Sequence, residues 1–295
     1  MTDDQYQLLD SGGGEKLERF GDFVLRRPSP QALWRREANA SLWDGATARF
    51  ERHDKGGGVW DGRERLPEQW RCRIAEIDFR LSPTNFGHVG VFPEQRPFWQ
   101  WIRARCAEEA AQRNEALRVL NLFAYTGGSS LAAALGGADV THCDASKGIV
   151  RWASENAEAQ DLGQGRIRWI IDDAMKFLAR EARRDSRYDA IILDPPSFGR
   201  GPKGQVWKLE ESIFELLQAC RPVLSDRPSF VLLSAHTPGL GAMAFRILLN
   251  QALGSECGGN YAHGEMALRG AEASHPLPNG TWSSWSSGSP PEPPA

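Results

Sequence analysis

The sequence predicts an α/β protein: a seven-stranded sheet with helices on both faces and an antiparallel hairpin at its edge, preceded by a small β-rich domain. Apolar strands and helical segments alternate from Arg118 onward, and the last two strands have no helix between them. Short polar segments broken by Gly and Pro fill the first part of the chain. We place the β-rich domain at residues 1–90, the α/β domain at 91–286 and a disordered, Ser/Pro-rich tail at 287–295.

The composition is that of an ordinary globular protein, with 41% hydrophobic and 25% charged residues in a chain of 295. It excludes a disordered chain, a collagen-like fibre and a coiled coil. No apolar run reaches the ~18–20 residues that span a bilayer, and the polar start is not typical of a signal peptide. Five scattered cysteines without a Cys-x-x-Cys pair favour a reduced, cytoplasmic protein with no zinc site and no other metal. A net charge of −3 gives no whole-chain reason to expect nucleic acid, and a local basic patch stays open.

In the first part of the chain, strands are expected at four places between turn signals: Tyr6–Asp10, Phe23–Arg26, Arg49–Arg52 and Arg73–Leu81. Tryptophans concentrate here and just beyond, at positions 34, 43, 60, 70, 99 and 101. We favour a compact core with a solvated rim as the explanation of these aromatic and Arg residues. A substrate-reading face with stacked aromatics is the alternative.

The second part begins with a helix expected over Phe98–Asn114, where apolar residues recur at spacings of three and four. Strands are then expected at Arg118–Phe123, Asp139–Asp144, Arg166–Ile171, Tyr188–Leu193 and Ser229–Ala235. The expected helices between and after them are Ser129–Leu135, Ser146–Asp161, Ala174–Arg184, Gln205–Leu224 and Leu240–Leu253. This order implies a parallel sheet. The last strands, near Tyr261–Arg269 and Thr281–Ser286, are expected to form the antiparallel edge hairpin.

Ligands of open α/β sheets bind beyond the carboxyl ends of the strands, so the residues after each strand are the candidates for a site. The first strand runs into Phe123-Ala124-Tyr125-Thr126-Gly127. A glycine lets the backbone approach a ligand closely, and the following helix offers free N–H groups. The segment is neither Gly-x-Gly-x-x-Gly nor a Walker loop, which makes a dinucleotide or a triphosphate less expected. A glycine turn alone is more often structural.

Acidic residues end the second and third strands. Asp144 can accept hydrogen bonds from both hydroxyls of a ribose, while Ser146 is well placed to cap the next helix, and capping alone would explain the Asp-x-Ser group about as well. Asp173, after the third strand, can meet an adenine amino group or can equally cap a helix.

The fourth strand ends in Asp194-Pro195-Pro196-Ser197-Phe198, the most specific motif of the chain. Two prolines cannot donate ladder hydrogen bonds and hold the backbone rigid. Asp194 beside this fixed backbone forms an acceptor platform for a planar amine or base.

Together these motifs resemble the class I S-adenosylmethionine-dependent methyltransferases with their Rossmann-like sheet. The segment Asn121–Gly127 is similar to the Asn-x-Phe-x-Tyr-Thr-Gly motif of the group related to bacterial 23S ribosomal RNA methyltransferases, and Phe92–Arg96 is similar to a segment that flanks their cofactor pocket. The resemblance covers roughly residues 90–286. It implies S-adenosyl-L-methionine as the cofactor, with Phe123, Tyr125 and Gly127 at its methionine part, Asp144 at the ribose and Asp173 at the adenine. Thr126 and Ser146 are expected as further cofactor-binding residues. It also implies a catalytic segment at the methyl group, formed by Asp194, Pro195, Pro196 and Phe198.

Two departures from the family's patterns bear on the target. Ser197 stands where Asp-Pro-Pro-Tyr enzymes place a stacking aromatic, and Phe198 follows it. Methylation of cytosine at carbon 5 needs a cysteine nucleophile, which the ribosomal RNA group carries after strand five. This chain has Ala235 and His236 there. We therefore predict direct transfer to a nitrogen or oxygen of an RNA base, with ribosomal RNA as the first expectation.

The loop Gly199–Lys208 contains three basic residues and Trp207 beside the expected target pocket. It suits a phosphate-bearing substrate with a stacking surface, or it is a solvated loop whose Trp207 packs at the start of the next helix. Three other functions stay open: a methyltransferase acting on a protein or a small molecule, a nicotinamide-dependent oxidoreductase, and a non-catalytic RNA-binding relic of the fold. Neither a membrane nor a metal is expected as a partner, and the sequence does not fix the oligomeric state.

Overall fold

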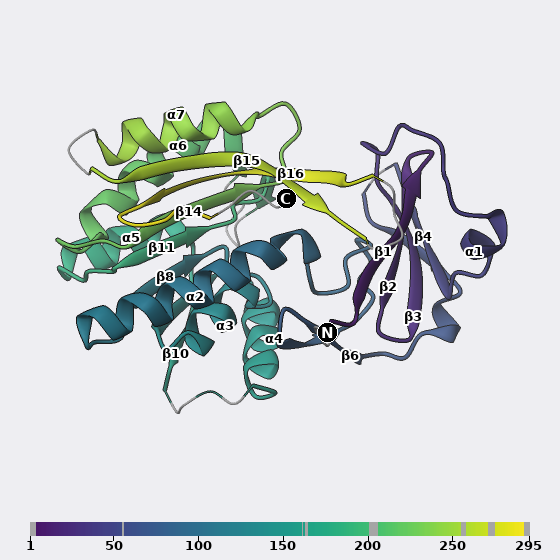
Figure 1. Ribbon diagram of the computed structural model, residues 1–295, viewed down its shortest axis with the longest axis horizontal. Coiled ribbons are helices and arrows are strands. Elements are labelled where there is room, and N and C mark those ends of the chain that lie inside the picture. Colours follow the sequence, from purple (N-terminus) through teal and green to yellow (C-terminus); the bar gives the residue numbers. More distant parts are fainter. Residues whose placement is uncertain are drawn as a thin grey trace. The chain divides into compact units, whose positions relative to one another are not determined.

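The computed structural model describes residues 4–54, 56–160, 162, 165–200, 206–254, 258–270 and 275–291. The chain divides into two compact units (Figure 1). Unit 1 consists of residues 1–96 and 267–279, and unit 2 of residues 97–266 and 280–295. The division into domains at residue 90 stays a prediction. Within the expected tail, residues 292–295 lie outside the described part of the chain.

Unit 1 is β-rich, as predicted. Its main sheet has five strands in the order β1-β2-β3-β4-β5, and β6 and β7 form a separate hairpin. The strands are β1 (Tyr6–Gly12), β2 (Glu15–Phe20), β3 (Phe23–Pro28), β4 (Ala48–Arg52), β5 (Gly58–Asp61), β6 (Trp70–Ile74) and β7 (Ile77–Leu81). In the described part of unit 1, one short helix, α1 (Ala40–Asp44), and two 3-10 turns, Arg63–Arg65 and Pro93–Gln95, accompany these strands.

The prediction of a single strand at Arg73–Leu81 is wrong, because the chain turns back at Ala75 and Glu76 to form the β6–β7 hairpin. Both residues have positive φ angles, 51° and 62°. Tight hairpin turns of this kind usually carry Asn-Gly or Asp-Gly, so Ala-Glu gives no signal in the sequence.

Strand β2 is not predicted from the sequence because charged residues occupy its inward positions. Glu18 is fully buried and accepts a hydrogen bond from the Tyr6 hydroxyl at 3.0 Å. Lys16 lies 3.1 Å from the same carboxylate, and Arg27 pairs with it as well. A buried charge is tolerated when it is paired in this way, but the pairing hides the alternation of apolar and polar residues by which strands are recognised.

Three of the four tryptophans of unit 1 belong to its core, and Trp34 is half-buried. Trp43, Trp60 and Trp70 are all buried, and each indole N–H donates to an acceptor inside the unit. The acceptors are the Asp10 carboxylate at 2.8 Å, the Thr84 carbonyl at 2.8 Å and the Phe20 carbonyl at 3.2 Å. Buried aromatic side chains of this size contribute much of the stability of a small unit.

Unit 2 contains a seven-stranded sheet in the order β10-β9-β8-β11-β14-β16-β15, which confirms the predicted fold class. The strands are β8 (Arg118–Leu122), β9 (Asp139–Asp144), β10 (Ile167–Ile171), β11 (Ala190–Leu193), β14 (Phe230–Ala235), β15 (Asn260–Leu268) and β16 (Leu277–Ser286). The pairs β10–β9, β9–β8, β8–β11 and β11–β14 are parallel, and β16 runs antiparallel to β14.

Helices cover both faces of this sheet (Figure 1). They are α2 (Arg96–Arg113), α3 (Gly128–Leu135), α4 (Lys147–Ala157), α5 (Ala174–Arg183), α6 (Leu209–Cys220) and α7 (Ala242–Leu253). Alternate strand residues such as Leu120, Leu122 and Ile191 pack into one core with α5, α6 and α7. Asn121, which points the other way, donates to Ser130 on α3 at 2.9 Å. Because helices cover both faces of the sheet, every residue of β11 and β14 is buried.

The expected helix Gln205–Leu224 begins later than predicted, since a small hairpin precedes it. Strand β12 (Phe198–Arg200) pairs antiparallel with β13 (Val206–Lys208), and α6 starts only at Leu209. The side chain of Arg200 and residues 201–205 lie outside the described structure.

The strand order reverses between β8 and β11, because β9 and β10 lie on one side of β8 and β14 lies beyond β11. In an open sheet the loops on either side of such a reversal separate and leave a crevice at the carboxyl ends of the strands. The glycine loop after β8 and the Asp-Pro-Pro segment after β11 are the two neighbours at this point.

Candidate functional site

The loop after β8 holds two non-glycine residues in the left-handed region, Phe123 at φ 54° and Tyr125 at φ 49°. Each such residue costs on the order of 1–3 kcal/mol, and strain of this kind clusters at functional sites. The loop is held by hydrogen bonds on both sides. The Ala124 N–H donates to the Cys143 carbonyl at 3.2 Å, and the Asn156 amide donates to the Thr126 carbonyl at 2.9 Å.

Gly127 and Gly128 are required for different reasons. Gly127 has φ 96° at the N-cap of α3, a conformation that other residues rarely adopt. A side chain on Gly128 would place its Cβ 2.6 Å from the ring of Trp99, so Gly128 allows α3 to pack against α2. Of the two, Gly127 is the glycine with a possible ligand role, and Gly128 serves packing.

Asp144, at the end of β9, is half-buried and linked to the glycine loop. Its carboxylate accepts the Tyr125 N–H at 3.1 Å and the Ser146 N–H at 2.9 Å. Burial raises the pKa of Asp144 above its usual value, although these two N–H donors work in the opposite direction. A carboxylate has about four acceptor positions, so the two oxygens retain capacity for donors from a ligand. The Ser146 hydroxyl meanwhile caps α4 by accepting the Ile149 N–H at 3.4 Å.

Asp173 acts as a helix cap in this structure. Its carboxylate accepts the Lys176 N–H at 3.0 Å at the start of α5, and the neighbouring Asp172 pairs with Arg180 at 2.6 Å. A role for Asp173 toward an adenine stays a prediction. The motifs do not single out Ile171, whose side chain is 52% exposed. It lies opposite Asp144 in the β10–β9 register, so an apolar surface borders the carboxylate.

The Asp194–Ser197 segment is fixed from two neighbouring elements. Ser234 on β14 donates to the Asp194 carboxylate at 2.8 Å, and Thr237, which follows β14, donates to the Ser197 hydroxyl at 2.8 Å. The indole N–H of Trp207 on β13 donates to the Pro196 carbonyl at 2.7 Å. The sequence motifs do not point to Ser234 or Thr237, because hydroxyl residues after a strand are common and only the fold brings these two to the segment.

The two aromatic residues of the β12–β13 hairpin differ in exposure. Trp207 packs against the Phe123 ring, with ring centroids 5.3 Å apart, so the structure favours the interpretation in which this tryptophan packs inward. Phe198, two residues after Pro196, is 53% exposed. Lys208 pairs with Glu211 at 2.7 Å.

No described cysteine resembles a nucleophile. Cys72, Cys106, Cys143 and Cys220 are buried, and burial raises the pKa of each thiol to about 12. A thiol with such a pKa carries almost no thiolate at neutral pH, and the thiolate is the reactive form. Cys257 lies outside the described residues.

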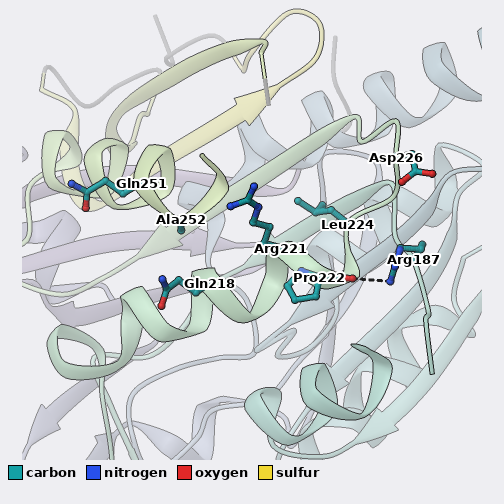
Figure 2. A pocket seen from close by; sticks show the side chains of 8 residues that line it. All are labelled: Arg187, Gln218, Arg221, Pro222, Leu224, Asp226, Gln251 and Ala252. Atoms are coloured by element: carbon teal, nitrogen blue, oxygen red, sulfur yellow. Dashed lines mark hydrogen bonds between the residues drawn. The ribbon is translucent and has the colours of Figure 1, made fainter. Parts of the chain in front are cut away.

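A separate cavity of about 530 Å³ lies at the opposite end of the strands. Figure 2 shows its lining side chains, among them Gln218 in the last turn of α6, Arg221 just after α6 and Gln251 near the end of α7. Arg187, just before β11, donates to the Pro222 carbonyl at 2.7 Å (Figure 2). Since these residues lie at the amino ends of β11 and β14, the cavity is not part of the candidate site.

Among the described residues, no group of three or more His, Cys, Asp or Glu side chains could hold a metal ion. No helix in that part of the chain has both the length and the apolar character needed to cross a membrane.

A family model, a solved structure and curated relatives that match this chain are all described as methyltransferases. Residues 48–224 match the family model described as S-adenosylmethionine-dependent methyltransferase. The crystal structure of a SAM-dependent methyltransferase from Agrobacterium tumefaciens is 40% identical, covers 96% of this chain and 91% of that one, and superposes with a TM-score of 0.90. A structure of SMU.776 with SAH bound is 21% identical, with a TM-score of 0.74 over 96% of this chain and 75% of that one, which shows the fold alone.

Curated relatives share part of their length with the chain. A ribosomal RNA large subunit methyltransferase K/L from Shewanella frigidimarina is 31% identical over 249 residues, which is 77% of this chain and 34% of the relative. The protein of the same name from Pseudoalteromonas translucida is 28% identical over 196 residues, 62% of this chain and 26% of the relative. The chain thus spans about a quarter to a third of the length of these relatives.

Proposed function

Because the chain belongs to the S-adenosylmethionine-dependent methyltransferase family, we propose that it transfers the methyl group of this cofactor directly to a nitrogen or oxygen of an RNA base. The observation that carries the proposal is the meeting of two acidic sites at the strand-order reversal. Asp144 is tied to the glycine loop after β8, and Asp194 directly follows β11, which pairs with β8. A cofactor held at the Asp144 side and a target held at the Asp194 side would then meet in one crevice.

The residues present fit the cofactor. Asp144 supplies a half-buried carboxylate for the ribose hydroxyls, and the exposed Ile171 beside it supplies an apolar surface for the adenine ring. The strained Phe123–Gly127 loop supplies main-chain groups for the methionine part. When bound, S-adenosylmethionine carries its own activated methyl group on a sulfonium, so no protein nucleophile or metal is needed for the transfer.

On the target side, the segment Asp194–Ser197 orients the acceptor atom. The Asp194 carboxylate is held by Ser234 and accepts hydrogen bonds from an amine, which places the lone pair of that amine toward the methyl group. The rigid Pro195-Pro196 backbone keeps this geometry, and alignment of the reacting atoms is the main contribution the protein makes. The exposed Phe198 offers a face on which a flat base can stack.

The names of the curated relatives and the exposed aromatic residue Phe198 support RNA as the substrate. Ribosomal RNA is the first candidate among RNA substrates. The buried thiols support a nitrogen or oxygen acceptor rather than carbon 5 of a pyrimidine. We place the reaction in the cytoplasm, where ribosomal RNA and reduced cysteines both occur. A protein or a small molecule is the second candidate substrate, favoured by the net charge of −3.

A methyl-transfer assay separates these substrates. The purified chain with labelled S-adenosylmethionine should methylate ribosomal RNA from a strain that lacks its gene, and should leave RNA from the parent strain and the protein fraction unlabelled. In single-turnover reactions, Asp194→Ala should lose most of the transfer rate while keeping most of its cofactor affinity. Near-normal single turnover in Asp194→Ala would remove this residue from the mechanism, and label in protein alone would move the substrate to the second candidate.

A further inference from the structure

We propose that Trp207 is a positioning residue that joins the cofactor loop to the target segment, so that the two sides of the crevice are held in register. The proposal rests on the proposed methyl transfer and extends it to a residue that does not touch the reacting atoms. Trp207 lies on β13, outside the sheet that carries the motifs, and its two functional groups face different loops.

The indole N–H of Trp207 acts on the target side. It donates to the Pro196 carbonyl at 2.7 Å, inside the segment that orients the acceptor atom. Prolines have no N–H of their own, so side-chain and main-chain donors from other elements must fix this stretch. The Leu209 N–H, directly after β13, donates to the next carbonyl, that of Ser197, at 3.0 Å. Trp207 on β13 and Leu209 just after it therefore fix the position of the Pro196-Ser197 backbone.

The ring of Trp207 acts on the cofactor side. It packs on Phe123 at a centroid distance of 5.3 Å and an angle of 46°, and Phe123 is one of the two left-handed residues of the glycine loop. The other, Tyr125, donates its N–H to Asp144. The strained loop is thus held between the ribose carboxylate on one side and the Trp207 ring on the other.

The β12–β13 hairpin brings Gly199 next to both Trp207 and Pro196. Trp207 stands opposite Gly199 in the β12–β13 register, and a Cβ on Gly199 would lie 3.6 Å from the Trp207 Cβ and 3.8 Å from the Pro196 ring. The indole itself contacts both loops, through its N–H to the Pro196 carbonyl and through its ring to Phe123. A residue that contacts two loops in this way couples their positions.

Two substitutions separate the two functional groups. Trp207→Phe keeps an aromatic ring for Phe123 but removes the N–H, and Trp207→Ala removes both. The matched control is Trp101→Phe on α2, whose indole N–H also donates to a main-chain carbonyl, that of Ser289 at 3.4 Å, away from the site. The affinity for S-adenosylhomocysteine is measured by calorimetry, and kcat is measured with saturating S-adenosylmethionine and ribosomal RNA from the deletion strain.

Trp207→Phe should keep its cofactor affinity within about twofold and lower kcat about tenfold, as expected for the loss of one hydrogen bond. Trp207→Ala should in addition weaken the cofactor about two- to tenfold, the usual range for an aromatic pair. In a double-mutant cycle, Phe123→Ala combined with Trp207→Ala should bind the cofactor no more weakly than Phe123→Ala alone. Trp101→Phe should change neither quantity.

The proposal is overturned if Trp207→Phe retains normal kcat, or if both Trp207 variants change affinity and kcat in parallel with a falling melting temperature, as a purely structural tryptophan would. It is also overturned if the effects of Phe123→Ala and Trp207→Ala on affinity add. A wild-type chain that binds the cofactor but methylates no RNA would contradict the proposed substrate only, since the calorimetric comparison still decides the role of the ring.

Discussion

Replacing Asp144 with alanine should weaken binding of S-adenosylmethionine about ten- to a hundredfold. The half-buried carboxylate has acceptor capacity for the ribose hydroxyls beyond its bonds to Tyr125 and Ser146. The loss of a hydrogen bond to a charged group costs roughly 1.5–3 kcal/mol, which corresponds to this range of affinity. The substitution also frees the Tyr125 N–H, which loosens the strained loop and adds to the loss.

The pH dependence of the same affinity gives a second measure. Burial raises the pKa of Asp144 in the free protein, so the carboxylate takes up a proton at a higher pH than an exposed aspartate does, whose pKa is about 3.9. Only the ionised form accepts two hydroxyl donors well. The affinity of the wild-type chain should therefore fall as the pH is lowered toward the pKa of Asp144, and the Asp144→Ala variant should lack this fall.

Isothermal calorimetry measures the affinity for S-adenosylmethionine of the wild-type chain, of Asp144→Ala and of one control variant. Asp139→Ala is the control, because Asp139 lies at the other end of the same strand and pairs with Arg166 at 3.1 Å. Its affinity should equal that of the wild type. An Asp144→Ala protein that is folded and binds the cofactor normally would refute the assignment of the ribose to this carboxylate.

Three further predictions concern other parts of unit 2. His142 is buried and its pKa is lowered to about 3. Because the unfolded histidine has a pKa of about 6.5, stability is lost as the pH falls from about 6.5 to about 3, by roughly 5 kcal/mol in total, and His142→Leu should flatten this part of an acid denaturation curve. Gly128→Ala should lower the melting temperature, because the new Cβ would lie 2.6 Å from the Trp99 ring; a variant as stable as the wild type would show that α3 can shift at no cost. RNA containing 5-fluorocytidine should form no covalent adduct on a denaturing gel, and Cys220→Ser should stay active; an adduct abolished by changing one cysteine would move the target to carbon 5.

The α/β part could be predicted closely because its signals are local. Five largely apolar strands alternate with helices of ordinary length, and the rules for connections between strands leave few sheet orders for such a chain. Asp144 and Asp194 could be found for the same reason, as each ends a strand that is recognisable on its own. The structure then shows that both have fixed neighbours, which no spacing in the sequence indicates.

What could not be predicted depends on contacts between distant residues. The β6–β7 turn at Ala75 and Glu76 has positive φ angles without the residues that favour them, and β2 buries charges that are paired only in the folded unit. The roles of Ser234 and Trp207 in holding the Asp-Pro-Pro segment arise from chain separations of 40 and 11 residues. The roles of Ser234 and Trp207 can be recognised only in the folded structure, which brings them next to Asp194 and Pro196.

The central claim, direct methyl transfer to an RNA base at the Asp194 segment, is tested most directly by mass mapping of ribosomal RNA. RNA from a strain that lacks the gene should miss one methyl group on a base nitrogen or oxygen. Incubation with the wild-type chain and S-adenosylmethionine should restore it, and incubation with Asp194→Ala should not. Ribosomal RNA with the same methylation in both strains, or a restored methyl group on carbon 5 of a pyrimidine, would contradict the account.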